Sequence, residues 1–166
     1  KNFLELMSHH ETDVIVWGAR GYPGAIKNPN MYGWIDYNKD NNLVKKVSVK
    51  KPLDNPREDL IIVGTFTFKK LKYFIDSVES MKKRKALINN EYYIDTAIND
   101  SISLNLNCRV FEINNYICWG TPDDLRVFEY WQSCFHKWKS HKYSIHNDPN
   151  INKSIADKLE ARIYGK

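Results

Sequence analysis

The order of apolar and polar positions predicts strands that alternate with helices along the chain. A short helix is predicted within residues 1–10, and an apolar run over 14–17 predicts a short buried strand. Residues 34–37 and 43–49 alternate apolar and polar side chains around a polar turn, which is typical of a β-hairpin. The run of β-formers over 60–68 begins fully apolar, so we expect a central strand there.

Helical periodicity dominates the second half of the chain. Apolar residues recur every three or four positions over 70–85, and a further helix is predicted over 92–104. Strands are expected over 109–113 and 116–119. The sequence Thr-Pro-Asp-Asp at 121–124 is typical of a helix start, because it supplies an N-cap hydroxyl, a proline at the first helical position and acids in the first turn.

This last helix and the tail complete the pattern. We expect the apolar stripe of the helix to be buried, and its members are Leu125, Phe128, Trp131 and Phe135. Residues 140–150 have the composition of a linker, and a modest helix is predicted over 151–164. Alternating strands and helices indicate an α/β fold with a mostly parallel or mixed sheet. We therefore expect one domain over residues 1–139, followed by a polar linker and short helix over 140–166.

The composition supports a globular domain and limits its partners. The 166 residues are 42% hydrophobic, which is enough for one packed core. The net charge of +5, from 25 basic and 20 acidic residues, suits a phosphorylated small molecule and is too mild to require nucleic acid. Most aromatic residues occupy core-periodic positions, so an RNA-binding domain that stacks bases is the weaker interpretation.

Cysteine usage and hydropathy indicate a cytoplasmic protein. Cys108, Cys118 and Cys134 are odd in number and lack metal-binding spacing, so we expect reduced thiols and no zinc site. No apolar run approaches the ~20 residues of a membrane span, and no signal-peptide pattern is present. The chain begins at Lys1 without an initiator methionine, and we expect it to be a fragment.

Five short motifs follow one another in a distinctive order. They are Met-Tyr-Gly-Trp at 31–34, Val-Ser-Val-Lys-Lys-Pro at 47–52, Val-Gly-Thr-Phe-Thr-Phe at 63–68, Asn-Glu-Tyr-Tyr-Ile-Asp-Thr-Ala-Ile-Asn at 90–99, and Asn-Tyr-Ile-Cys-Trp-Gly-Thr-Pro-Asp-Asp-Leu at 115–125. This order resembles the second half of sugar-phosphate nucleotidyltransferases, or nucleotide-sugar pyrophosphorylases, especially those of capsule and surface-polysaccharide pathways. The resemblance covers about residues 5–138. It implies the C-terminal portion of a Rossmann-like domain, with a mixed, mostly parallel sheet flanked by helices.

The resemblance implies transfer of a nucleoside monophosphate from an NTP to a sugar 1-phosphate or similar acceptor, with release of pyrophosphate and with Mg²⁺ as cofactor. Lys51 matches the lysine that reaches the sugar phosphate, so it is the implied catalytic and substrate-binding residue. Gly33 matches the glycine whose backbone approaches the acceptor, and Trp34 beside it is taken as substrate-binding. Glu91 resembles the acid that binds acceptor hydroxyls, and Asp95 is the implied magnesium ligand.

Departures from the pattern leave other interpretations open. Lys50 stands where the family often has Glu, the turn at 118–120 lacks an aspartate, and the glycine-rich triphosphate loop is absent, so we expect no turnover from this chain alone. From the residues alone, Lys51 also fits a solvated strand end. Glu91 and Asp95, four apart on one predicted helix face, also fit acids at a helix N-terminus. The main alternative is a non-catalytic module that binds phosphosugars or a protein. Neither nucleic acid nor a membrane is expected as a partner, and a homo-oligomer is left open.

Overall fold

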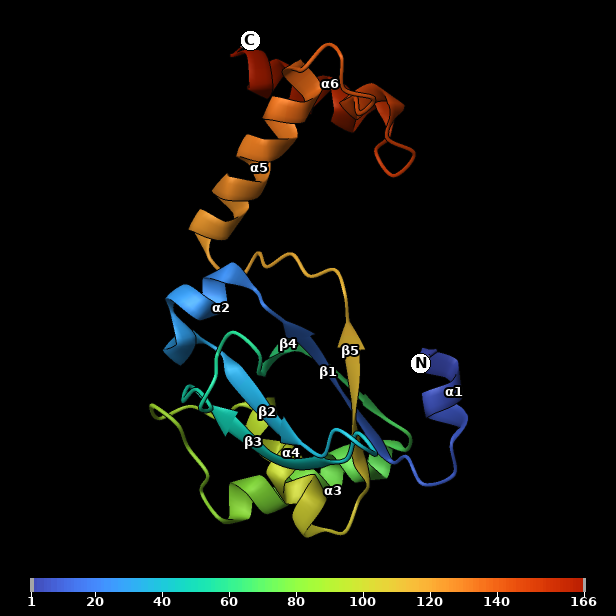
Figure 1. Cartoon of the computed structure of the whole chain (residues 1–166), viewed down its shortest axis with the longest axis vertical. Coiled ribbons are helices and arrows are strands. Elements are labelled where there is room, and N and C mark those ends of the chain that lie inside the picture. The colour runs from blue at the N-terminus through green and yellow to red at the C-terminus, as the bar shows by residue number, and fades with distance from the viewer. Residues whose placement is uncertain (1, 166) are drawn as a thin grey trace. The chain divides into compact units, whose positions relative to one another are not determined.

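The computed structural model describes residues 2–165, and the chain divides into two compact units, Lys1–Tyr116 and Ile117–Lys166. We call them the sheet unit and the helical unit and describe each by itself (Figure 1). The domain boundary predicted after residue 139 stays a prediction. None of the described helices is both long enough and apolar enough to cross a membrane.

Strands and helices of the sheet unit are joined mostly by short connections. Its elements are α1 (Phe3–Ser8), β1 (Val14–Arg20), α2 (Pro23–Lys27), the 3-10 helix η1 (Pro29–Met31), β2 (Gly33–Tyr37), β3 (Val44–Val49), β4 (Leu60–Phe68), α3 (Leu71–Lys83), α4 (Ile94–Ser103) and β5 (Cys108–Ile113). Most lie close to the predicted ranges. The strand predicted over 116–119 is wrong, since this segment has no regular structure, and α4 begins at Ile94 rather than at residue 92.

One five-stranded sheet organises this unit, in the order β3-β2-β4-β1-β5. Within residues 2–165, β1 and β5 pair in parallel, whereas β1 with β4, β2 with β3, and β2 with β4 pair antiparallel. The α/β class and the helices flanking the sheet are confirmed, but the expectation of a mostly parallel sheet is wrong. The reason is that loops rather than helices connect β2, β3 and β4, and a parallel neighbour needs a long crossover connection.

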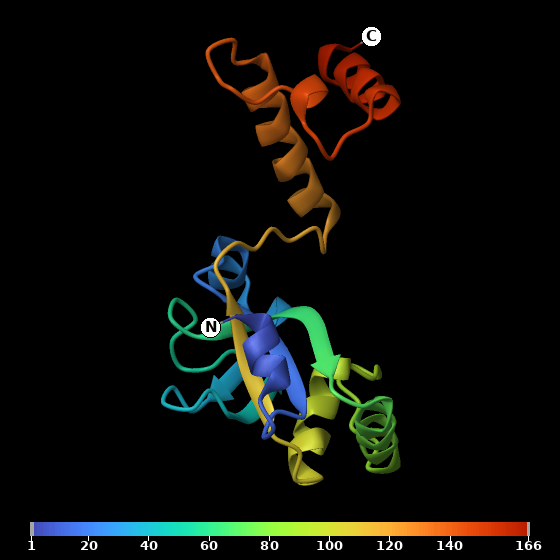
Figure 2. The ribbon, with the colours of Figure 1, turned by 90° about the vertical axis from the view of Figure 1, so that its right-hand side faces the viewer.

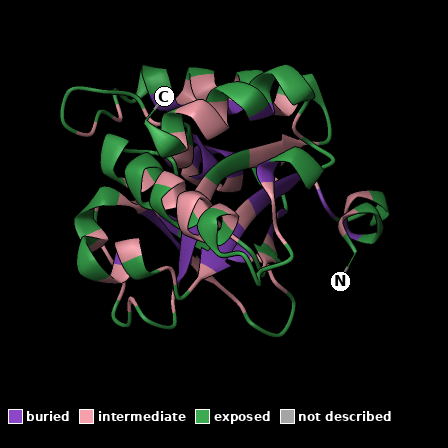
Figure 3. Cartoon of the chain, turned by 90° about the horizontal axis from the view of Figure 1, so that it is seen from above, coloured by how far each residue is buried: buried purple, intermediate pink, exposed green. Residues whose placement is uncertain are grey.

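The larger core lies between the sheet and the helices α3 and α4. Its buried residues include Val16 on β1, Ile35 on β2, Leu60 on β4 and Ile98 on α4. The two helices lie side by side on this face of the sheet (Figures 1 and 2). Buried residues are concentrated in the strands, while the helices present exposed residues outward (Figure 3). This packing holds α4 firmly against the sheet.

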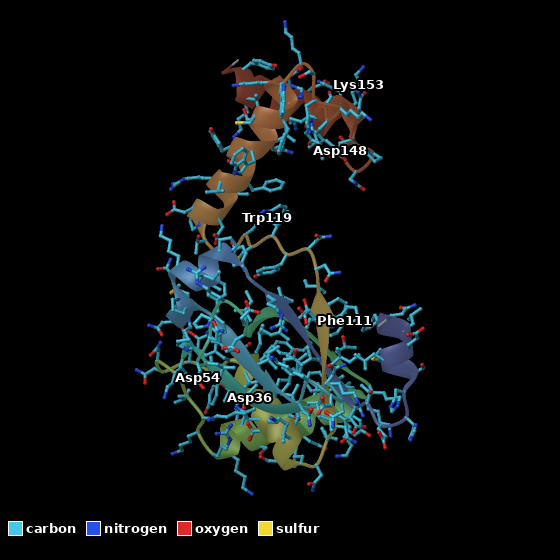
Figure 4. The ribbon with its side chains drawn as sticks, in the orientation of Figure 1. Asp36, Asp54, Phe111, Trp119, Asp148 and Lys153 are labelled. Carbon is cyan, nitrogen blue, oxygen red and sulfur yellow. The ribbon has the colours of Figure 1, made fainter. Side chains whose placement is uncertain are left out.

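A second, smaller set of apolar contacts covers the opposite side of the sheet. Trp34 of β2 packs there with Ala25 of α2. Nearer to β5, the Phe3 ring of α1 lies 5.1 Å from the Trp17 ring and 5.7 Å from the Phe111 ring, measured between centroids (Figure 4 labels Phe111). Both sides of the sheet are therefore covered, as expected for an α/β fold.

Polar contacts fix the position of α4. The Val47 N–H donates to the Asn99 side-chain oxygen at 2.8 Å, and the Asn99 amide nitrogen donates back to the Val47 carbonyl at 2.9 Å. On the other side of the helix, buried Asp100 accepts hydrogen bonds from Arg84 at 2.6 and 2.7 Å and from Ser80 at 2.9 Å. These bonds set the register of α4 against β3 and α3, and thereby the place of its first turn.

The helical unit contains two longer helices and one short turn of helix. Its elements are α5 (Pro122–Lys137), the 3-10 helix η2 (Ile145–Asn147) and α6 (Lys153–Tyr164). The start of α5 is as predicted, because Thr121 caps it in a reciprocal hydrogen-bond pair with Asp124. The expectation of a buried apolar stripe on α5 is wrong, since Leu125, Trp131 and Phe135 are exposed. The reason is that α6 contacts the polar side of α5 instead.

Candidate functional site

The glycine that begins β2 and the acid in the first turn of α4 touch each other. Gly33 pairs with Val49 at the end of β3, and Asp95 lies in the first turn of α4. A Cβ atom added to Gly33 would overlap the Asp95 carboxylate and would also crowd the Ile62 side chain. Only glycine leaves space for the carboxylate here, so the residue type at position 33 follows from the close approach of α4.

A lysine completes this contact, and it is Lys50. Lys50 follows β3 with a φ of 57°, a left-handed conformation that is uncommon outside glycine, and its N–H donates to the Tyr32 carbonyl at 3.0 Å. The Lys50 ammonium lies 5.3 Å from the centre of the Tyr93 ring, within cation–π range. Burial raises the pKa of the Asp95 carboxyl, while its own backbone N–H and the positive charge of Lys50 act in the opposite direction. A partly buried carboxylate therefore faces a nearby cation.

Tyr93 links this group to Glu91. Its hydroxyl donates to the Glu91 carboxylate at 2.5 Å, and this hydrogen bond is the main cause of the raised pKa of Tyr93. Glu91 itself closes a two-residue turn, in which Asn89 and Asn90 both have positive φ and Ile88 exchanges two backbone hydrogen bonds with Glu91.

The shared helix face predicted for Glu91 and Asp95 is therefore wrong. Glu91 precedes the first helical residue, Ile94, because the turn at its N-terminal side holds it in a β-bridge. Tyr93 joins the two acids instead: its hydroxyl binds Glu91, and the negative charge of Asp95 contributes to its raised pKa.

Lys51 and Trp34 occupy different environments. Lys51 is exposed, one residue beyond Lys50, and its carbonyl accepts a hydrogen bond from the Ser48 hydroxyl at 2.7 Å. Trp34 is fully buried, and its indole N–H donates to the Pro29 carbonyl at 2.9 Å. Its ring belongs to the apolar cluster with Ala25 rather than to the core that contains Ile98. The substrate-binding roles of Lys51 and Trp34 stay predictions.

The structure thus brings together Gly33, Lys50, Glu91, Tyr93 and Asp95, and we call these five residues the Lys50–Asp95 site. The sequence interpretation did not place Lys50 or Tyr93 among the site residues. The sequence did show a second lysine, Lys50, beside Lys51, but it was interpreted as a departure from the family, which often has Glu at this position. For Tyr93, the available signal was its position between two acids just before a predicted helix.

The Lys50–Asp95 site offers the positive and negative groups that a phosphorylated ligand with hydroxyls would contact. The lysine ammonium donates up to three hydrogen bonds, and the carboxylates accept them. The absence of a side chain at Gly33 gives the Asp95 carboxylate its space at the start of β2. Such a set can orient a polar anion, since charge-assisted hydrogen bonds are the strong ones in proteins.

The site fits magnesium only in part. Among the described residues, no three His, Cys, Asp or Glu side chains are grouped so that they could hold a metal ion. Asp95 offers one carboxylate, and its charged neighbour is a lysine. Mg²⁺ prefers six oxygen ligands, so most of its ligands at this place would have to come from bound phosphate and water.

The Cys-Trp-Gly-Thr turn belongs to the helical unit and contains no acid before α5. The Gly120 N–H lies 3.3 Å from the Cys118 sulfur, and the Trp119 ring packs edge-on against Phe128 at 5.0 Å. A thiol is a poor ligand for a hard cation such as Mg²⁺. This turn therefore supplies no magnesium ligand before Thr121.

No protein-family profile matches the chain, and no curated protein matches its sequence. Solved structures do match its fold. A nucleoside-diphosphate-sugar pyrophosphorylase from Vibrio cholerae RC9 is similar with a TM-score of 0.62 and 18% identity, over 77% of this chain and 50% of that one. A CMP:2-keto-3-deoxy-manno-octonic acid synthetase complexed with CTP is similar with a TM-score of 0.49 and 14% identity, over 79% of this chain and 53% of that one. The chain spans about half the length of the solved structures it matches, and the pyrophosphorylase shows the fold that it shares.

Proposed function

We propose that this chain is the acceptor-binding part of a sugar-phosphate nucleotidyltransferase. The whole enzyme would transfer a nucleoside monophosphate from an NTP to a sugar 1-phosphate or a similar acceptor and release pyrophosphate. The setting proposed is the cytoplasm, in the synthesis of capsule or surface-polysaccharide precursors. The observation that carries the proposal is the meeting of Gly33, Lys50 and Asp95 where β2 begins, β3 ends and α4 starts. The fold shared with the Vibrio cholerae pyrophosphorylase supports it.

Each residue of the site has a stated task in this proposal. Lys50 and Lys51, at the end of β3, neutralise the acceptor phosphate, whose oxygen attacks the α-phosphate of the NTP. Glu91 and Asp95 accept hydrogen bonds from acceptor hydroxyls, and Gly33 leaves the space that the Asp95 carboxylate occupies. Trp34, a residue of β2, contributes by packing against Ala25 of α2.

Magnesium enters the proposal through Asp95. If the ion binds here, Asp95 gives it one carboxylate ligand, and phosphate oxygens and water are the usual remaining ligands. The ion would neutralise the charge on the phosphates. The protein's own contribution is to place this carboxylate beside Lys50.

Binding of glucose 1-phosphate, measured by titration calorimetry on the purified chain, tests the proposal. We expect Lys50→Ala and Lys51→Ala each to weaken binding by about 10-fold or more, because a hydrogen bond to a charged group contributes roughly 1.5–3 kcal/mol. The matched control is Lys45→Ala, which removes an exposed lysine near the other end of β3. Equal losses in all three variants would indicate a mere effect of net charge and would contradict the proposal.

Turnover is a separate question. We expect no pyrophosphate release when the 166-residue chain is mixed with NTP, sugar 1-phosphate and Mg²⁺, because it lacks the glycine-rich triphosphate loop. Pyrophosphate release above the level of a Lys50→Ala, Lys51→Ala double variant would show that this chain alone contains a complete site.

One observation favours a second candidate function. Lys50 and the single carboxylate of Asp95 suit an anion better than a metal, which fits a non-catalytic module that binds phosphosugars. In that case glucose 1-phosphate would bind equally well with and without Mg²⁺, and the protein would not bind NTP. Tight NTP binding that requires Mg²⁺ would favour the enzyme.

A further inference from the structure

The positive charge of the chain is concentrated on one helix of the sheet unit. Residues 69–85, which contain α3, carry seven basic side chains and two acidic ones. Their net charge of +5 equals that of the whole chain, so the remaining residues have as many acids as bases. Averaged over 166 residues this charge is mild, and the composition therefore predicts no membrane partner. On a single helix the same charge is high, and it creates a local positive potential.

The helix dipole explains only part of this charge. Basic residues are stabilised at the C-terminal end of a helix, which accounts for Lys82 and Lys83 in the last turn of α3. The N-terminal end favours acids, yet α3 has no acid in its first turn and directly follows Lys69 and Lys70. Lys72 adds a third lysine at this end. Basic side chains at both ends therefore indicate a role outside the helix itself.

Most of these charges are not neutralised within the protein. Ion pairs join Lys72 to Asp76 at 3.0 Å and Arg84 to Asp100 at 2.6 Å. Lys70 lies over the Tyr73 ring, which leaves its charge uncompensated. Within residues 2–165, the basic side chains of this segment that are exposed and have no acidic partner are Lys69, Lys70, Lys82, Lys83 and Lys85. These lysines lie at the two ends of α3, and we call them the α3 lysines.

Two aliphatic side chains lie on the outer face of the same helix. Leu71 is 72% exposed and Ile75 is 44% exposed. They are four residues apart and Lys82 is seven residues further along, so the three lie on one helix face. α3 lies at the outer side of the sheet unit (Figure 2). A basic helix face with exposed aliphatic residues is typical of a helix that lies on an anionic membrane surface.

Nucleic acid fits this face less well than a lipid surface does. Proteins bind nucleic acids through arginine forks and through aromatic side chains that stack on bases. The single arginine of the segment, Arg84, is held by Asp100, and the most exposed apolar residues of α3 are aliphatic. Lysine ammonium groups attract anionic headgroups as point charges, while aliphatic side chains enter the boundary between headgroups and acyl chains.

We propose that the outer face of α3 binds the surface of a membrane that contains anionic phospholipids. The helix lies flat, with Leu71 and Ile75 at the boundary between headgroups and acyl chains and the α3 lysines near lipid phosphates. A helix of 13 residues is about 20 Å long, so the lysines at its two ends reach different lipids. A fluid layer of headgroups supplies anions at both ends at once, whereas a protein partner needs acids at the matching spacing. The contact is peripheral and reversible, because two aliphatic side chains bury little apolar area.

Flotation of the purified chain with lipid vesicles tests the proposal. We expect binding to vesicles of equal parts phosphatidylglycerol and phosphatidylcholine, no binding to phosphatidylcholine alone, and weaker binding as the salt concentration rises. The double variant Lys82→Glu, Lys83→Glu should bind at least about 10-fold more weakly, because each lysine near the surface contributes about fivefold. The matched control is Lys45→Glu, Lys46→Glu, which makes the same change of net charge on β3 and should bind nearly as well as the parent.

Leu71→Gln distinguishes a membrane from other polyanions. This variant keeps every charge, so it should weaken binding to the mixed vesicles several-fold through the loss of apolar burial. Its affinity for single-stranded RNA and for polyglutamate, the probes for a nucleic acid and for an acidic protein, should equal that of the parent. Both affinities should be lower than the affinity for the mixed vesicles.

Three outcomes would overturn the proposal. Equal losses in the two double variants would show that net charge alone attracts the chain to vesicles. Tighter binding to RNA or to polyglutamate than to the mixed vesicles would assign this face to a nucleic acid or to an acidic protein. Absence of vesicle binding at low salt would show that the α3 lysines are only solvated. Far-ultraviolet circular dichroism identifies a variant that fails to fold, and Lys82→Gln, Lys83→Gln then replaces the charge reversal.

Discussion

The sheet unit and the helical unit use apolar side chains in opposite ways. In the sheet unit, large residues such as Ile15, Trp34 and Ile98 are fully buried in two clusters. Between residues 117 and 165 the buried apolar residues are Ile145 and Ala156, and the large aromatic residues of α5 are mostly exposed. Polar pairs such as Glu129 with Arg162 connect α5 to α6.

The sheet unit is therefore the more rigid of the two units. A close-packed interior holds neighbouring groups to sub-ångström positions, which a site such as Gly33 and Asp95 requires. The helical unit buries little apolar area, so polar pairs such as Glu129 with Arg162 carry more of its stability. We therefore expect two separate unfolding transitions, and the following changes test that expectation.

The largest effect is expected in the core of the sheet unit. Ile98→Ala leaves a cavity beneath the sheet and should cost about 2–5 kcal/mol of unfolding free energy. Urea unfolding followed by circular dichroism should show the loss in the more stable transition only. The control is Ile155→Ala on α6, which is half exposed and should cost under about 1 kcal/mol. Equal losses from both variants would mean that the two units unfold as one.

Gly33→Ala should lower the unfolding free energy less than Ile98→Ala does, but it changes the Lys50–Asp95 site directly. The added methyl group overlaps the Asp95 carboxylate, and crowding of this kind costs roughly 1–3 kcal/mol. Asp95→Ala in the same chain should remove most of this cost, which a double-mutant cycle by thermal unfolding measures. The absence of coupling between the two positions would show that the carboxylate and Gly33 are not in contact.

Asp95→Asn should make the sheet unit more stable while weakening acceptor binding. Burial raises the pKa of Asp95 above its ordinary value of 3.8, so its stabilising contribution is present below that value and is lost as the pH rises through the folded pKa. At neutral pH the charged form is therefore costly, and its removal should raise the stability of the sheet unit. The melting temperatures of the parent and of Asp95→Asn, measured from pH 3 to 8, should become equal at the acid end of this range. If Asp95→Asn were less stable than the parent at pH 7, the predicted stabilisation would be wrong.

The smallest effect is expected from Glu160 in the helical unit. Its hydrogen bonds with His146 and His136 lower the pKa of its carboxyl below the ordinary 4.5. Its contribution is therefore present above pH 4.5 and is lost as the pH falls through the lowered folded value. Glu160→Gln should lower the first thermal transition slightly at pH 7 and leave the second unchanged. A shift of the second transition would mean that the sheet unit depends on the helical one.

The sequence was informative where one local pattern decides the structure. The Thr-Pro-Asp-Asp start of α5 was predicted from capping chemistry alone, and the long strand β4 from its run of β-formers. The place of Glu91 was missed because Glu91 was assigned to the same helix face as Asp95, whereas α4 begins only at Ile94 and the turn at Asn89 and Asn90, both with positive φ, holds Glu91 in a β-bridge.

Other features depend on distant contacts and could not be predicted from spacing. Lys50 lies near Asp95 because α4 packs on β3, a contact that the resemblance behind the choice of Lys51 does not describe. The antiparallel pairing of the central strands depends on which strands become neighbours, and short apolar runs do not encode this. Periodicity predicted a buried stripe on α5, and the exposure of Leu125, Trp131 and Phe135 shows that spacing alone does not decide which side of a helix is covered.

The paired hydrogen bonds between Asn99 and Val47 protect one edge of the sheet from association with other molecules. β3 is the outermost strand, and its unpaired backbone groups are a template on which a strand of another molecule can add. The amide of Asn99 mimics a peptide unit and occupies both the donor and the acceptor of Val47. A single side chain of α4 thus blocks the middle of this edge against the cross-molecular pairing from which fibrils grow.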